Sequence, residues 1–267
     1  MPPAAHTPAL PSFAALRLPA AALVWALALQ PAAAQPLDDE GAEAGPQSSA
    51  VPPGLQSDRA GGLLRYGGEE WVVVNTLRSY SWSAAGGWQP AGPVREANKA
   101  AIRNAVEKFN AVPGLRLRLR YEESDDPELF VGNFRRHQDR FVIYWAEDAE
   151  EGGLAKPFSW HPKRGYKGGT LTFIKDRRGR RVSLKSKDSP EGPLAITGAA
   201  IFARERIRHA TDLARCKTDA PYYAFLHEIG HALGMGHATP GPSIMRGTCG
   251  ESYLPNDIAN LRSLYGP

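Results

Sequence analysis

The sequence predicts an α+β fold in which strands and helices follow one another after residue 65. Two patterns support this prediction. Short runs rich in β-branched and aromatic residues, at 71–75 and 141–145, have the length and composition of strands. Between them, residues 94–112 carry apolar side chains spaced for one face of a helix. A chain of this kind builds a sheet with helices packed against it.

The first 34 residues have the layout of a secretory signal peptide. One basic residue, Arg17, precedes a mostly apolar run at 18–29, and the alanines at 32–34 form the small-residue pattern of a cleavage site. The apolar run is shorter than the roughly 20 residues that a bilayer requires. We therefore expect a secreted chain, periplasmic or extracellular, without a stable membrane anchor; a retained anchor is the alternative.

Residues 35–65 are rich in Pro, Gly, Ala, Ser and acidic side chains and show no apolar period. Such a composition buries too little apolar surface to fold alone, so it indicates a low-complexity linker or a short propeptide. The domain that carries the chemistry is expected at 66–267.

The remaining strands follow the first helix, which Pro93 and Pro113 bound. Residues 115–121 alternate leucine and arginine before a tyrosine, which predicts a strand with one buried face. The continuous apolar run at 141–145 suits a more central strand. Two later apolar stretches, at 170–174 and 196–203, complete five predicted strands.

A second helix is expected to begin near Asp219, a favourable N-cap, with Pro221 in its first turn. His227 and His231 are four residues apart, so they lie on one face of this helix and can bind one metal ion. Glu228 is rotated by about 100° from His227. Its carboxylate is therefore expected beside the ion, where it can act as a general base.

His237 lies six residues beyond His231 and cannot reach the same ion from a continued helix. The helix has to end between them, and Gly234 is placed to take the left-handed conformation that ends a helix. Gly236 adds freedom to the returning chain. Three imidazoles leave a fourth position open, as in catalytic zinc sites, whereas structural sites are closed by four ligands. We therefore predict one catalytic Zn²⁺ held by His227, His231 and His237.

Residues 227–237 match every fixed position of the motif HExxHxxGxxH and so resemble the metzincin metallopeptidases. The small Ala238 after the third histidine is most similar to the matrixin branch. The resemblance implies a zincin/metzincin-like catalytic domain with a twisted mixed five-stranded sheet and two main helices. It also implies a Met-turn that places Met245 beneath the metal and a C-terminal helix at 256–266.

The resemblance extends to a substrate strand. Residues 152–158 are similar to the matrixin edge strand along which an extended substrate lies, so Leu154, Ala155 and Phe158 are implied as substrate contacts. A plain surface loop is the alternative for this stretch.

The function that the resemblance implies is a zinc-dependent metalloendopeptidase. Zinc activates a water molecule, Glu228 acts as the general base, and the substrate is a protein or peptide. We expect a monomer. The alternatives are a zinc-binding module without catalysis, against which the intact Glu228 argues, and a hydrolase of cell-wall peptide crosslinks. No Asp-rich loop indicates a calcium site, so calcium binding stays open.

Cys216 and Cys249 are the two cysteines of the chain and bracket the zinc motif. Export makes a disulfide between them feasible, and it would contribute roughly 3 to 4 kcal/mol by the loop-entropy model. Two separate buried thiols are the alternative.

The net charge of +4 is mild and does not indicate a nucleic-acid partner. Basic residues gather in the segment 177–187, which is predicted to be an exposed loop with a solvated charged face. An anionic partner or a self-cleavage loop is the alternative for this segment.

Overall fold

The computed structural model describes residues 51–57, 62–83, 87–146, 168–182, 194–204, 222–237, 240–246 and 250–267. All of them belong to one unit of the chain, Gln35–Pro267. The strands are β1 (Glu70–Ser83), β2 (Gly87–Pro93), β3 (Arg118–Ser124), β4 (Phe141–Ala146), β5 (Gly168–Lys175), β6 (Arg181–Val182) and β7 (Ala195–Arg204). The helices are α1 (Glu96–Asn110), α3 (Tyr222–Ala232) and α4 (Pro255–Tyr265), with short 3₁₀ helices η2 (Val131–Arg136) and η4 (Ile244–Arg246).

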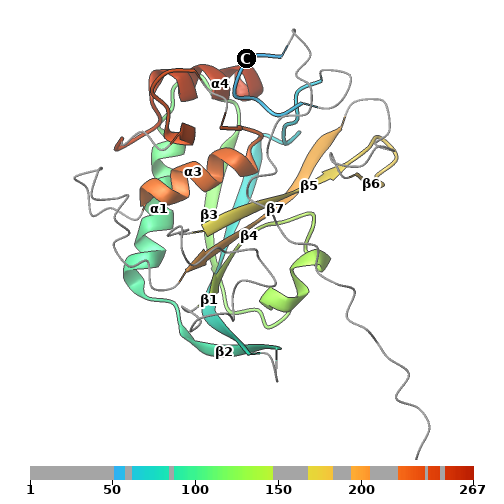
Figure 1. Ribbon diagram of the computed structural model, residues 1–267, viewed down its shortest axis with the longest axis vertical. Coiled ribbons are helices and arrows are strands. Elements are labelled where there is room, and N and C mark those ends of the chain that lie inside the picture. Colours follow the sequence, from blue (N-terminus) through green and yellow to red (C-terminus); the bar gives the residue numbers. More distant parts are fainter. Residues whose placement is uncertain are drawn as a thin grey trace, which may run out of the picture. The chain divides into compact units, whose positions relative to one another are not determined.

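The strands form one mixed sheet in the order β2-β1-β4-β7-β5-β6, and β3 also pairs with β1 (Figure 1). The pairs β1–β3, β1–β4 and β4–β7 are parallel. The pairs β1–β2, β5–β7 and β5–β6 are antiparallel. Strand β4 lies between two parallel neighbours, which confirms the prediction of a central strand at 141–145.

The predicted fold class is wrong. The sequence led us to expect a zincin-like domain with five strands and two main helices, whereas the described residues form a seven-stranded sheet with three short helices. The strands cover more of the chain than the helices do. Strand β1 was expected at 71–75 but is 14 residues long, and its second half pairs with β2. Residues 76–93 have no continuous apolar run, so their pairing depends on neighbouring strands and not on composition.

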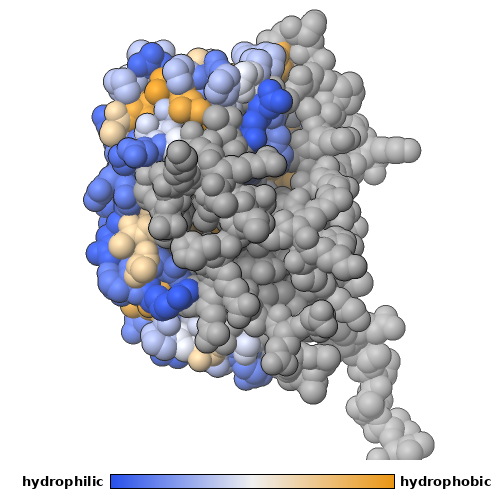
Figure 2. Space-filling view, turned by 60° about the vertical axis from the view of Figure 1, so that its left-hand side comes forward, coloured by the Kyte–Doolittle hydropathy of each residue, from blue (hydrophilic) through white to orange (hydrophobic). Residues whose placement is uncertain are grey.

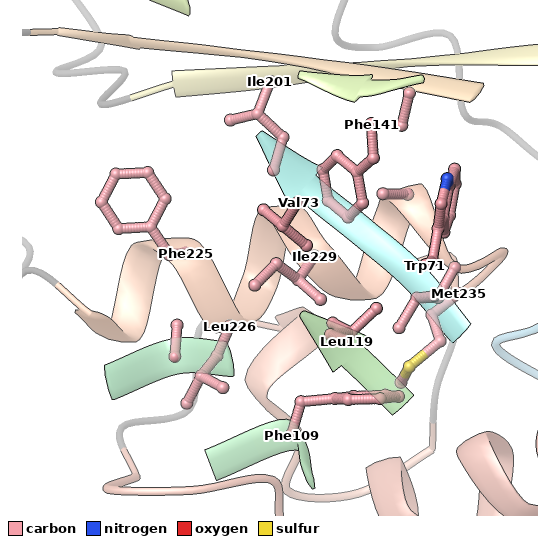
Figure 3. Packing of buried hydrophobic residues seen from close by; sticks show 14 of the residues in the cluster. Trp71, Val73, Phe109, Leu119, Phe141, Ile201, Phe225, Leu226, Ile229 and Met235 are labelled. Atoms are coloured by element: carbon pink, nitrogen blue, oxygen red, sulfur yellow. The ribbon is translucent and has the colours of Figure 1, made fainter. Parts of the chain in front are cut away.

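Alternation along β4 places its side chains in two separate clusters. Phe141, Ile143 and Trp145 belong to the main core, whereas Val142 and Tyr144 belong to a smaller cluster on the other face of the sheet. Helices α1, α3 and α4 contribute to the main core. Figure 3 shows Phe225, Leu226 and Ile229 of α3 among the side chains of the sheet.

Two segments before β1 contribute to the main core; they lie within residues 35–65, for which a linker or short propeptide stays a prediction. Val51, Leu55 and Leu64 are buried in the main core. The backbone N–H of Ile196 in β7 donates to the carbonyl of Arg65 at 3.0 Å. Residues 51–57 and 62–66 therefore pack as an integral part of the domain.

The distribution of polar side chains on the described surface is consistent with this apolar core. On the face seen in Figure 2, the described residues are mainly hydrophilic, and the hydrophobic areas among them are small. The apolar side chains of the helices are accordingly turned to the sheet. Among the described helices, none is both long enough and apolar enough to cross a membrane.

Candidate metal centre

Helix α3 places the first two histidines by its own periodicity. His227 and His231 lie one turn apart, and their Nε2 atoms are 3.0 Å apart. The helix is fixed against the sheet by Leu226 and Ile229, which are fully buried. Because the helix is locked by its apolar face, both imidazoles are held on one side of it, one turn apart.

The chain reverses just after α3 and returns the third histidine to the first two. Gly234 has φ of 96°, its N–H donates to His231 O at 3.0 Å, and Met235 N–H donates to Gly230 O at 2.9 Å. These two bonds form the glycine C-cap that ends a helix in the left-handed conformation. His237 Nε2 then lies 2.9 Å from that of His231 and 3.2 Å from that of His227.

The backbone around Gly234 leaves no room for a side chain. A Cβ at this position would collide with the carbonyl oxygen of Leu64. Glycine is thus required here both by its φ and by the close approach of another segment. At Gly236, by contrast, a Cβ would meet nothing within 4 Å.

Backbone carbonyls set the tautomer of two of the imidazoles. His227 Nδ1 lies 3.0 Å from Ile244 O, and His231 Nδ1 lies 2.9 Å from Met235 O. Because a carbonyl oxygen only accepts hydrogen bonds, each Nδ1 carries the proton and donates. The Nε2 atom of each ring faces the other histidines, and in a neutral ring with its proton on Nδ1 this atom carries the lone pair.

The surroundings lower the pKa values of His231 and His237. Burial, together with the neighbouring His227 and His237, holds the pKa of His231 well below its ordinary value. Burial and the neighbouring His227 lower the pKa of His237 to about 4. Both rings are therefore neutral at neutral pH, which is the form that binds a metal.

The three nitrogens fit a zinc ion. At a Zn–N distance of about 2.0 to 2.1 Å, tetrahedral geometry places two ligand nitrogens about 3.3 Å apart. The observed Nε2 separations run from 2.9 to 3.2 Å. Lone pairs at such distances repel one another unless a cation lies between them, and three imidazoles are a preferred donor set for zinc.

Glu228 lies beside this cluster and is held by the sheet. Thr170 of β5 donates its hydroxyl to Glu228 Oε2 at 2.6 Å and also lies 3.1 Å from the backbone oxygen of Glu228. Further along β5, the Thr172 hydroxyl is 3.4 Å from His231 O. Strand β5 thus runs alongside α3 and orients the carboxylate. No sequence pattern had indicated this role for Thr170.

Met245 packs against α3 at Gly230, and its place beneath a metal ion stays a prediction. Its side chain is buried, and a Cβ at Gly230 would collide with its sulfur atom. The turn is tied to α4 by the buried carboxylate of Asp257, which accepts hydrogen bonds from Ser243 Oγ and from the N–H of Ile244 at 2.8 Å. Because Ile244 O orients His227, Asp257 supports the histidine cluster indirectly. An acidic residue in the first turn of a helix was the only sequence signal for it.

Several predicted site residues lie outside the described residues. These are the two cysteines, Cys216 and Cys249, and the three residues of the implied substrate strand, Leu154, Ala155 and Phe158. The disulfide and the substrate strand at 152–158 therefore stay predictions.

The described part of the basic segment forms the turn between β5 and β6. Arg177, Arg178, Arg180 and Arg181 are exposed, as predicted. Arg180 pairs with Asp176 at 2.9 Å, and Asp176 also accepts the backbone N–H groups of Arg178 and Arg180. These bonds close the turn locally.

Comparison with known proteins assigns this chain to no family. No protein-family model and no curated protein matches the chain. Among solved structures, the chain is similar to one in a structure titled "GM1 bound form of the ECX AB5 holotoxin", at 11% sequence identity and a TM-score of 0.39. The match covers 79% of this chain and 87% of that chain. A likeness at this TM-score supports no statement about fold or function.

Proposed function

We propose that this chain is a secreted zinc-dependent metalloendopeptidase, with one Zn²⁺ on His227, His231 and His237 and with Glu228 as general base. One observation carries the proposal: three imidazole Nε2 atoms converge within 3.2 Å of one another on α3 and the turn that follows it. The carboxylate of the intervening Glu228 is oriented by Thr170 and does not belong to the cluster.

The chemistry follows from these positions. Zinc, when bound, lowers the pKa of a water molecule to about 7 and polarises the substrate carbonyl. The Glu228 carboxylate accepts a proton from the attacking water as the new C–O bond forms. It then delivers that proton to the amine nitrogen as the C–N bond breaks. The products are a carboxylic acid and an amine, which account for all atoms of the peptide and the water.

The position of β5 favours an extended peptide as substrate. Within the described residues, one edge of β5 pairs with β7, and on the other edge only Ile174 and Lys175 pair with β6. The remaining length of that second edge, toward Gly168, includes Thr170, which contacts Glu228. A peptide that added to this edge as a further strand would pass beside the general base.

The decisive experiment is Glu228→Gln. The amide keeps the size of the side chain and its bond from Thr170 but cannot accept the proton, so peptide cleavage should fall by about 10²- to 10⁴-fold. Zinc content, measured on the same preparations, should stay at one ion per chain. Casein, gelatin and peptidoglycan serve as substrates, so that hydrolysis of cell-wall crosslinks is recognised if it occurs.

Two outcomes would contradict the proposal. If the variant keeps its zinc and cleaves at the rate of the parent, Glu228 is not the base. If the zinc-loaded parent cleaves none of these substrates, the chain is a zinc-binding module without catalysis.

A further inference from the structure

A short segment far upstream pairs with the turn that carries the third histidine. Leu55 and Met235 form an antiparallel bridge. On either side of it, Gln56 N–H donates to Gly234 O at 2.8 Å and Gly236 N–H donates to Gly54 O at 2.9 Å. We call residues 54–56 the clip and residues 233–237 the metal loop.

The side chain of Gln56 reaches the hydrogen-bond network of the metal site. Gln56 Nε2 donates to Met235 O at 3.2 Å, and the same oxygen accepts His231 Nδ1–H at 2.9 Å. A carbonyl oxygen has two lone pairs and can accept both bonds. The amide of Gln56 therefore fixes the orientation of the carbonyl that in turn orients the imidazole of His231.

The clip is held in place by its contacts with the main core. Leu55 is 3% exposed and Val51 is 6% exposed, and both pack in the main core. Leu64 N–H donates to Gln56 O at 2.9 Å, so the chain after the clip folds back on it. The clip is thus held by burial and by backbone bonds that do not involve the side chain of Gln56.

We propose that Gln56 is a positioning residue for the zinc ligand His231 and that the clip is part of the metal site. This inference rests on the zinc site of the proposed function but not on peptidase activity. Partners of ligating histidines tune metal affinity by about 10- to 100-fold, and Gln56 acts one hydrogen bond further away. It follows that a maturation cut which removed residues 54–56 would weaken zinc binding.

The test is Gln56→Met in the full-length chain. Methionine keeps the length of the side chain and the backbone bonds of the clip but removes the donor to Met235 O. The matched control is Arg65→Met, because Arg65 Nη1 also donates to a backbone carbonyl, that of Leu264 at 3.0 Å, in α4 and not in the metal loop. Zinc affinity is measured by competition with a chelator, and the visible spectrum of the Co²⁺-loaded protein reports the ligand geometry.

We expect Gln56→Met to bind Zn²⁺ about tenfold more weakly, with an altered Co²⁺ spectrum, and Arg65→Met to match the parent in both. Thermal unfolding without metal identifies any general loss of stability. An unchanged zinc affinity in Gln56→Met would refute the inference, as would an equal weakening in Arg65→Met. Neither result depends on cleavage, so the peptidase proposal stands or falls separately.

Discussion

The two halves of the candidate metal centre are built in different ways. His227 and His231 stand on α3, where four residues of separation place them one turn apart. His237 stands on the metal loop, whose conformation is held by the clip, by Leu64 packed against Gly234, and by the Tyr265 hydroxyl, which donates to Leu233 O at 2.9 Å. The spacing of His227 and His231 follows from local helical geometry, whereas the position of His237 depends on other segments, of which the clip and Leu64 lie more than 150 residues away in the sequence.

This difference predicts how each half responds to changes elsewhere in the chain. A helix holds its backbone by hydrogen bonds within itself, so the spacing of its ligand pair does not depend on the clip, although the orientation of the His231 ring does. The metal loop has few internal bonds, and its order depends on the pairing of Gly234 and Gly236 with the clip. Changes to the backbone pairing of the clip should therefore displace His237 while leaving the helical spacing of His227 and His231 intact.

The largest effect is expected from the helical half itself. His231→Ala removes the histidine whose Nε2 lies closest to both others, so the chain should no longer retain a stoichiometric zinc ion. Metal analysis of the purified protein checks this. His137→Ala, which removes a histidine of the η2 region that bonds to Glu128 O, is the control and should keep its zinc. A full zinc complement in His231→Ala would disprove the three-ligand site.

The second-largest effect is expected from a substitution in the metal loop. Gly234→Ala forces a Cβ onto a residue with φ of 96° and into the carbonyl of Leu64. The left-handed conformation alone costs about 1 to 2 kcal/mol, so the free energy of unfolding should fall by at least that much and zinc affinity should fall with it. Gly236→Ala, where a Cβ meets nothing, is the matched control. Denaturant unfolding measures the free energy of unfolding, and competition with a chelator measures zinc affinity. If Gly234→Ala and Gly236→Ala show equal losses, the metal loop is not held in this way.

The smallest effect is expected at Thr170, which bonds to the proposed general base Glu228. Thr170→Val removes the hydrogen bond to Glu228 Oε2 while keeping the shape of the side chain, so turnover should fall roughly tenfold without loss of zinc. Thr170→Ser keeps the hydroxyl and should restore turnover. Thr172→Val, whose hydroxyl is near His231 O, controls for a general change in β5. If serine fails to restore the rate, Thr170 acts through packing and not through its hydrogen bond.

The strands show which parts of the fold could be predicted from the sequence. The runs at 71–75, 141–145 and 170–174 lie within β1, β4 and β5, because their apolar residues signal burial directly. The hairpin of β1 with β2 and the two-residue β6 were not predicted. Such short or polar strands are stabilised by the neighbour that they pair with, and that neighbour leaves no mark in their own composition.

For the metal centre, the sequence alone determined the histidine pair, the offset of Glu228 and the turn at Gly234. Each follows from a rule that acts over a few residues: helical periodicity, and the ability of glycine to adopt positive φ. Only the tertiary structure shows that Thr170 bonds to Glu228, that Gln56 bonds to the carbonyl that accepts from His231, and that Asp257 bonds to the turn that carries Ile244. Their hydrogen bonds join residues brought together by packing, over separations that carry no periodic signal, so they depend on the whole domain being folded.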